Sequence, residues 1–137
     1  MFKGIRYFSV AVTNLDEAIE RYQKLFGLEV VVPVTERPYG FKSATLGNGE
    51  ERLIELIQPS GDDSNLGRFM KERAIPSNPN GEGIYMISVE VDDIEKTVEQ
   101  IKDGGGRITQ NERTPNEAWV HPTSSNFAFM GLVQSSS

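Results

Sequence analysis

The sequence contains no cysteine and only one histidine among its 137 residues. The first absence excludes disulfide bonds, thiolate nucleophiles and cysteine metal sites. The second excludes any site that needs two imidazoles from one chain. Positive charge is also scarce, since 14 Lys and Arg stand against 20 Asp and Glu and the formal net charge is −6. Nucleic acid is therefore an unfavourable partner, whereas a neutral or cationic ligand, or simply a solubilising surface, fits this charge.

Long apolar runs are missing as well. No segment approaches the roughly 20 apolar residues that cross a bilayer, and no basic region followed by an apolar stretch opens the chain. We therefore expect a cytoplasmic protein without membrane contact. A hydrophobic content of 37% and a charged content of 25% are ordinary for a globular protein, and the length suits one domain.

What the chain does contain is an internal repeat. Residues 7–19 resemble residues 86–98 at a constant offset of 79 (86 − 7), and residues 54–58 resemble residues 130–134 at an offset of 76 (130 − 54). A duplication of this period indicates two copies of one supersecondary unit, each too small to bury a core alone. We expect function where the two copies face each other.

The first copy predicts a strand, a helix and three more strands. Alternating apolar residues over 5–12 are typical of a half-buried strand. Asn14 with Glu17 forms a capping box for a helix that ends at Gly27. A valine-rich strand and a hairpin follow, and Asn48-Gly49 supplies the positive φ angles of its turn. The strands after the helix are expected at 28–34, 41–46 and 52–58.

The second copy repeats this order after a short helix capped by Ser64 and a linker over 76–83 that is rich in proline, glycine and asparagine. Its helix begins near Asp93, and three glycines at 104–106 end it. Its strands are expected at 84–91, 107–110, 118–121 and 126–134, and the last three serines are expected to be a frayed tail.

These elements predict an α+β fold of two tandem βαβββ modules, which form a curved, eight-stranded open trough with the helices outside. We expect a single domain over 1–137. Module one covers about 1–60, the connecting helix and linker about 61–83, and module two about 84–134.

Strand alternation separates the residues that lie under the helices from those that line the trough. A lining of apolar walls with a few polar groups is typical of a small-molecule site. The expected lining residues are Tyr7, Ser9, Ala11, Leu53, Glu55, Ile57, Met86, Ser88, Glu90, Phe129, Gly131 and Val133.

The repeated order and several sequence segments resemble the vicinal oxygen chelate superfamily, which includes glyoxalases, extradiol dioxygenases and bleomycin-resistance proteins. The branch most similar is that of methylmalonyl-CoA epimerase and glyoxalase I. The resemblance extends from about residue 5 to 134. It is carried by residues 8–22, 25–30, 53–59 and 88–95 and by His121-Pro122.

The resemblance implies a divalent metal held by four side chains at symmetric strand positions. These positions carry Tyr7, Glu55, Met86 and Gly131 in this sequence. Only Glu55 suits a hard metal, because phenol is a poor ligand, a thioether prefers soft ions and glycine offers no side chain. We therefore predict that the usual metal is absent and that no other cofactor replaces it. The resemblance also implies a homodimer.

Glu55 and Tyr7 are the candidate catalytic residues. Inside the trough, desolvation would raise the pKa of Glu55 and make it a general acid or base; on the surface it would only form a salt bridge. Tyr7 would donate a hydrogen bond to a carbonyl or enolate, or fill the space of the missing metal.

The other trough residues each have a functional and a structural interpretation. Met86 and Gly131 would shape the cavity, Gly131 by opening space for a larger ligand. Trp119 and Phe129 would be aromatic walls or ordinary core. His121 could titrate near neutrality or simply end a strand. Glu90 would be a second acid or an exposed side chain.

Two functions remain open. The first is a metal-independent lyase or isomerase acting on a small organic molecule, in which Glu55 moves the proton and Tyr7, with Ser9 or Ser88, binds the oxygen where charge develops. The alternative is a protein that binds and sequesters an antibiotic or another hydrophobic or cationic compound without chemistry. The absent metal ligands, the acidic charge and the aromatic lining fit the alternative. The helix and linker region over residues 63–70 resembles that of the epimerases and favours the lyase or isomerase, which is the function we expect.

Overall fold

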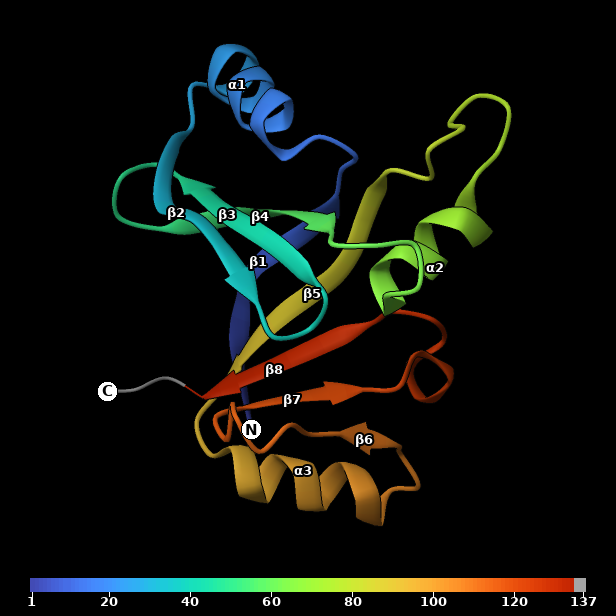
Figure 1. Cartoon of the computed structure of the whole chain (residues 1–137). Helices are drawn as coiled ribbons and strands as arrows, with labels where there is room; N and C mark the ends of the chain where they lie inside the picture. The colour runs from blue at the N-terminus through green and yellow to red at the C-terminus, as the bar shows by residue number, and fades with distance from the viewer. Residues whose placement is uncertain (135–137) are drawn as a thin grey trace. The chain divides into compact units, whose positions relative to one another are not determined.

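The computed structural model describes residues 1–134 (Figure 1), so the three C-terminal serines lie outside the described residues. The described chain has an α+β fold, as predicted. Its elements are β1 Phe2–Ala11, α1 Leu15–Phe26, β2 Glu29–Arg37, β3 Phe41–Gly47, β4 Arg52–Pro59, α2 Asn65–Arg73, β5 Gly83–Val91, α3 Ile94–Asp103, β6 Ile108–Thr109, β7 Glu117–Val120, the 3₁₀ turn Pro122–Ser125 and β8 Met130–Gln134.

The chain divides into two compact units. The first unit comprises residues 8–85, and the second comprises residues 1–7 together with the residues from 86 onward. Strands β1 and β5 each continue from one unit into the other. Among the described residues, no helix has the length and apolar character needed to span a bilayer.

The first unit contains an open mixed sheet in the order β2-β3-β4-β1. β2 and β3 run antiparallel, as do β3 and β4, whereas β4 and β1 run parallel. Asn14 caps α1 by accepting the N–H of Glu17, and Gly27 ends it in the left-handed region at φ 65°, as predicted. One face of the sheet packs under α1 around a buried core of Val12, Leu15, Ala18, Ala44, Leu46 and Leu56.

The opposite face of this sheet meets α2 near one end. Ser64 caps α2 by accepting the N–H of Gly67, which confirms the predicted cap. Ala11 and Ile57 pack against α2 in a second buried cluster with Leu66 and Met70. The two faces of one sheet are therefore covered by different helices.

The second unit repeats the strand pattern of the first in the order β5-β8-β7-β6, with β5 and β8 parallel and the other neighbours antiparallel. Asp93 caps α3 through the N–H of Lys96, and Gly104 ends the helix, as predicted. One face of this sheet packs under α3 around Val89, Val91, Ile94, Val98, Ala118, Val120 and Leu132. Each unit thus contains one copy of the repeat's sheet and helix.

The repeat extends to individual hydrogen bonds. The side-chain oxygen of Gln58 accepts the N–H of Leu15 at 2.7 Å, and that of Gln134 accepts the N–H of Ile94 at 2.8 Å. Each glutamine lies at the C-terminal end of the fourth strand of its copy, Gln58 one residue before the last of β4 and Gln134 the last of β8, and binds the first residue of its own helix. The first N–H groups of a helix have no hydrogen-bond partner within the helix. In both copies a glutamine side chain supplies that partner.

Two sequence expectations are wrong in detail. β8 begins at Met130 rather than at Asn126, because Asn126 and Phe127 have positive φ angles of 55° and 65° after the 3₁₀ turn. In the β3–β4 turn only Gly49 has a positive φ, of 97°. Asn48 contributes through its side chain instead, whose oxygen accepts the N–H of Glu51 at 2.9 Å.

The connection between α2 and β5 is held by polar contacts. Asn78 donates from its side-chain amide to the carbonyl of Glu82 at 2.8 Å, and the Glu82 carboxylate accepts the N–H of Thr13 at 2.9 Å. The segment predicted as a linker is therefore bound to the loop that precedes α1.

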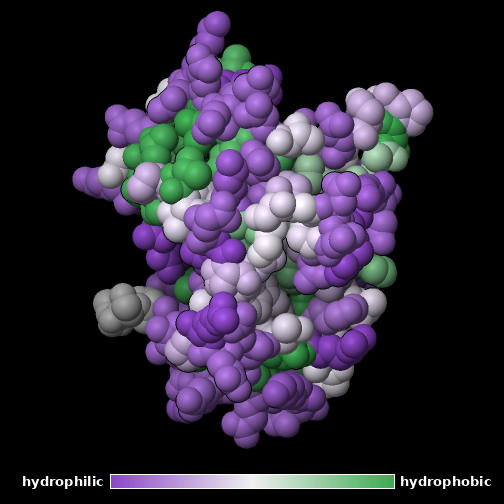
Figure 2. Space-filling model, in the orientation of Figure 1, coloured by the Kyte–Doolittle hydropathy of each residue, from purple (hydrophilic) through white to green (hydrophobic). Residues whose placement is uncertain are grey.

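Figure 2 shows a mostly hydrophilic visible face with an apolar area in the region of α1 and β2. The exposed large apolar side chains of these two elements are Leu25, Phe26, Val30 and Val34. β2 is also the outermost strand of the first unit's sheet.

Candidate functional site

The first unit has a row of polar side chains across three adjacent strands. Glu55 on β4 is in register with Ser9 on β1 and with Thr45 on β3. Directly opposed residues of neighbouring strands point to the same face of a sheet. Their sequence neighbours Leu56 and Ala44 pack under α1. The row therefore lies on the face turned away from α1, as predicted for Ser9 and Glu55.

Glu55 is buried and hydrogen-bonded. Its exposed fraction is 6%, and those of Ser9 and Thr45 are 0% and 5%. Ser9 Oγ donates to Glu55 Oε1 at 2.7 Å. Within residues 1–134, Glu55 is the only carboxylate in the buried class. Removing a carboxylate from water is costly unless it is paired or hydrogen-bonded, and such groups concentrate at functional sites.

The corresponding row of the second unit has no carboxylate. Ser88 on β5 is in register with Gly131 on β8, which in turn opposes Trp119 on β7. A Cβ atom at Gly131 would lie 2.9 Å from Met86 Sδ and 3.5 Å from Trp119 Cδ1. The Met86 thioether thus occupies the space beside Gly131. The expectation that Gly131 also opens space for a larger ligand stays a prediction.

The four positions that the resemblance assigns to a metal carry side chains of unlike chemistry. In the second unit Met86 offers a thioether and Gly131 offers nothing, and Tyr7, half-buried on β1, offers a phenol. In the first unit the Glu55 carboxylate accepts from Ser9. This donor set does not fit a hard divalent ion. Within residues 1–134 there is also no cluster of three His, Asp or Glu side chains suited to a metal.

His121 stabilises the turn that follows β7. Its Nδ1 accepts the N–H of Thr123 at 3.2 Å and lies 2.7 Å from Thr123 Oγ1. These contacts cap the 3₁₀ turn Pro122–Ser125. This geometry supports the interpretation in which His121 ends a strand, because its imidazole binds Thr123 of the following turn.

The remaining predicted site residues lie in the second unit. Trp119 and Phe129 are half-buried, and the Phe129 carbonyl accepts the N–H of Ile87 at 2.9 Å. Ser88 is 3% exposed. The Glu90 carboxylate forms an ion pair with Lys3 Nζ at 3.7 Å. Glu90 is thus engaged in a partly exposed pair rather than buried like Glu55.

Two polar residues on this face of the first unit were missed by the sequence analysis. Ser43 and Thr45 on β3 are each 5% exposed. The signal was present, because Ser43 and Thr45 alternate with Ala44 and Leu46, which pack under α1. The polar members of that alternation belong to the face of Glu55.

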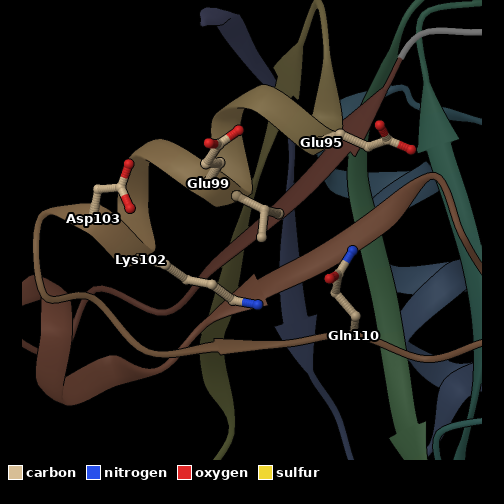
Figure 3. A pocket seen from close by; sticks show the side chains of 6 residues that line it. Glu95, Glu99, Lys102, Asp103 and Gln110 are labelled. Atoms are coloured by element: carbon tan, nitrogen blue, oxygen red, sulfur yellow. The ribbon is translucent and has the colours of Figure 1, made fainter.

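One open groove in the second unit lies beside α3 (Figure 3). Figure 3 shows the carboxylates of Glu95, Glu99 and Asp103 spread along the helix, while Lys102 and Gln110 extend between the helix and the strand below it. These are charged and polar side chains of a solvated helix face. α3 covers the face of Val89 and Leu132, so this groove lies on the other side of the sheet from Ser88 and Gly131.

Burial raises the pKa of the Tyr85 phenol above its ordinary value of 10.0. The phenol is therefore protonated at neutral pH. Its ring packs edge-on against Phe69, with the ring centroids 4.8 Å apart. Both rings belong to the cluster that α2 forms with Ala11 and Ile57. Tyr85 therefore forms part of the wall at the α2 end of the face that carries Glu55.

Comparison with known families gives one match over most of the chain. Residues 8–121 match the model of the glyoxalase/bleomycin resistance protein/dioxygenase superfamily. The matched region contains the whole first unit and residues 86–121 of the second unit.

Characterised relatives are similar over most of their length. The mitochondrial methylmalonyl-CoA epimerase of Dictyostelium discoideum is 33% identical over 137 aligned residues, which cover 95% of this chain and 77% of that protein. The ethylmalonyl-CoA/methylmalonyl-CoA epimerase of Cereibacter sphaeroides is 32% identical over 110 residues, which cover 79% and 75%.

Solved structures share the fold. The methylmalonyl-CoA epimerase of Mycobacterium tuberculosis superposes with a TM-score of 0.83 at 22% identity, covering 99% of this chain and 90% of that one. A variant of the Streptomyces coelicolor enzyme, in complex with 2-nitronate-propionyl-CoA, has the same TM-score and identity and covers 100% of both chains. At this identity the likeness shows the architecture alone.

Proposed function

The chain belongs to the glyoxalase/bleomycin resistance protein/dioxygenase superfamily, and we propose that it is an isomerase that moves a proton on a small organic molecule, with Glu55 as the base. The observation that carries this proposal is the burial of the Glu55 carboxylate, 6% exposed and hydrogen-bonded to Ser9, on the face not covered by α1. The two epimerase relatives support the isomerase class.

The substrate class we propose is an acyl-CoA thioester with an acidic C–H next to the carbonyl. The relatives are named for methylmalonyl-CoA and ethylmalonyl-CoA. Glu55 would remove the proton from the α-carbon, and the C–H electron pair would move into the thioester carbonyl to give an enolate. Protonation of the α-carbon from solvent on the face opposite to Glu55 then gives the epimer, and the proton on Glu55 is released to solvent, without any net oxidation or reduction.

The negative charge on the enolate oxygen needs hydrogen-bond donors. The divalent metal that the resemblance implies would supply this charge stabilisation. The donors at the corresponding positions here do not fit such an ion, so we propose a metal-independent reaction. The Tyr7 phenol and the Ser88 hydroxyl are the donors we propose instead, because both lie on the strand faces that the repeat assigns to the site.

We retain three further expectations as proposals. The chain functions as one domain of two modules, it forms a homodimer, and it acts on a small molecule rather than on nucleic acid. The exposed apolar side chains of α1 and β2, such as Phe26 and Val34, offer one surface for a second copy. Sedimentation equilibrium measures the oligomeric state directly.

The second candidate function is binding without chemistry. Met86 Sδ and Trp119 Cδ1 lie 2.9 Å and 3.5 Å from the position of a Cβ atom at Gly131, where the resemblance implies a metal ligand. An apolar corner of this kind favours retention of a hydrophobic compound. In that case the protein would bind its ligand and release it unchanged.

Hydrogen exchange separates the two functions. We would incubate the protein with 2-methylmalonyl-CoA and related acyl-CoA thioesters in D₂O and follow loss of the α-proton by NMR. Wild-type protein should catalyse exchange, and Glu55→Gln should lose about 10²–10⁴-fold of the rate. Glu90→Gln removes a partly exposed carboxylate from a strand and serves as the control, with a rate close to wild type.

Unchanged exchange in Glu55→Gln would show that Glu55 is not the base. Saturable binding without exchange for every thioester tested would instead support sequestration. Metal content is measured on protein purified without chelator. Far less than one divalent ion per chain, with exchange rates unaffected by EDTA, is expected; stoichiometric manganese, zinc, iron or cobalt would refute metal independence.

A further inference from the structure

We propose that Ser9 is a positioning residue, which orients the Glu55 carboxylate and keeps it ionised, and that its counterpart Ser88 has no such role. The inference rests on the proposed function for its catalytic consequence, because Glu55 is the base there. Its physical part concerns only the ionisation of Glu55 and is tested separately.

The geometry of this pair is specific. Ser9 Oγ donates to Glu55 Oε1 at 2.7 Å, the usual length of a well-formed hydrogen bond from a hydroxyl. Ser9 is 0% exposed and lies in register with Glu55 in the parallel ladder of β1 and β4. Both side chains are therefore held by paired backbone, and water does not compete for the hydroxyl.

Two opposing effects act on the carboxylate. Burial disfavours its charged form, whereas a hydrogen bond donated to the charged form favours it. A base must be ionised at the working pH and must direct an oxygen at the substrate proton. The Ser9 hydroxyl supports both requirements, since it stabilises the anion and fixes the position of one carboxylate oxygen.

Glu55 shares its face of the first unit's sheet with polar and apolar side chains. Thr45 and Ser43 on β3 share its face, and α2 presents the apolar Leu66 and Met70 to that face near Ile57. The apolar neighbours of Glu55 on its own strand and face are Leu53 and Ile57.

Two ionisable groups, Arg37 and Tyr7, share this face. Arg37 on β2 opposes Phe41, four residues along β3 from Thr45, and the phenol of Tyr7 lies two residues before Ser9 on β1. The Ser9 hydroxyl binds the carboxylate directly, at 2.7 Å from Oε1.

The second copy of the repeat provides the matched control. Ser88 occupies the position of Ser9, is 3% exposed and lies in the same kind of parallel ladder, but its register partner is Gly131. Replacing either serine by alanine removes one buried hydroxyl from an equivalent strand. Only at Ser9 does this hydroxyl bind a carboxylate.

The test is an NMR titration of protein labelled with ¹³C at the glutamate carboxyl carbon, with the Glu55 signal assigned by its loss in Glu55→Gln. Ser9→Ala should raise the titration midpoint of Glu55 by about one to two pH units, the size of a hydrogen bond to a charged group. Ser9→Cys keeps the volume and a weaker donor and should give a smaller shift. Ser88→Ala should leave the midpoint unchanged. Circular dichroism confirms that each variant is folded.

An unmoved Glu55 midpoint in folded Ser9→Ala, or an equal shift in Ser88→Ala, would overturn the inference. The pH profile of α-proton exchange gives the catalytic part: its acidic limb should move in Ser9→Ala in the same direction as the midpoint. A shifted midpoint without any exchange activity in wild-type protein supports the role of Ser9 and contradicts the proposed function, so the two failures are distinguishable.

Discussion

The two copies of the repeat differ in the residue that faces the buried serine of the first strand: it is a glutamate in the first copy and a glycine in the second. Glu55 and Gly131 occupy corresponding positions on β4 and β8, and each is in register with a buried serine, Ser9 or Ser88. In the first unit the serine binds the carboxylate. In the second, Met86 fills the space beside the glycine. The same backbone thus carries a polar pair in one unit and an apolar contact in the other.

The features that both copies keep are those that the fold itself needs. Gln58 and Gln134 bind the first N–H of their helices, and Leu56 and Leu132 fill the cores under those helices. The face turned away from the helices is under no such constraint. Residues on that face can diverge without loss of the architecture, which is why function must be argued from them and not from the fold.

The largest expected effect tests whether the two cores are equivalent. Leu56 is 0% and Leu132 1% exposed, so Leu56→Ala and Leu132→Ala should each lower the free energy of unfolding by about 2–5 kcal/mol. Urea denaturation followed by circular dichroism measures both. A cost below about 1 kcal/mol for one of them would show that the copies do not stabilise the protein alike.

The next prediction concerns the glycine of the second copy. Gly131→Glu should destabilise the protein by about 1–3 kcal/mol, because its Cβ would approach Met86 Sδ to 2.9 Å and the longer side chain needs the space that Met86 fills. Gly61→Glu is the control, since a Cβ there meets no atom within 4 Å. Adding Met86→Ala should relieve part of the cost. Equal stability of Gly131→Glu and wild type would contradict the packing of Met86.

A smaller loss of stability is expected when the glutamine hydrogen bond that both copies share is removed. Gln58→Ala and Gln134→Ala each remove a hydrogen bond to a helix N-terminus and should cost about 0.5–1.5 kcal/mol each, to a similar extent. The exposed Gln110 gives a neutral control, Gln110→Ala. Thermal unfolding resolves differences of this size. A cost at one glutamine only would show that the second helix start is held differently.

The smallest expected effect lies at Thr13 and Asp92, which correspond at the offset of 79 (92 − 13). The N-terminal ammonium of Met1 donates to Asp92 and lowers the pKa of its carboxyl. A lowered pKa in the folded state stabilises the protein above the ordinary value of 3.8, and this contribution is lost as the pH falls below it. Asp92 is exposed, so the contribution is small.

Asp92→Asn should therefore be slightly less stable than wild type at neutral pH, and the difference should vanish in acid. Thr13→Ala, which removes the hydroxyl that donates to Glu82 at 3.2 Å, is the counterpart in the first copy. Stability measured across the acidic range separates the two. A difference that persists well below the ordinary aspartate pKa would exclude the ion pair as its cause.

Features set by neighbouring residues were predictable from the sequence. The caps Asn14, Ser64 and Asp93 and the terminating Gly27 are where the sequence places them, because each acts within three or four residues. The start of β8 was not predictable in the same way. Asn126 and Phe127 adopt positive φ angles to close a 3₁₀ turn, and an apolar pattern does not encode that conformation.

The sequence by itself determined the duplicated architecture and the mismatch of Glu55 with Gly131, since both follow from the order of residues and the alternation of strand faces. Only the tertiary structure decided that Ser9 binds Glu55, that Thr45 stands opposite it and that Met86 fills the space of Gly131. Ser9 and Glu55 are 46 residues apart, and Met86 and Gly131 are 45 apart (131 − 86). Contacts at such separation depend on strand register and side-chain packing, which are settled only when the sheet is assembled.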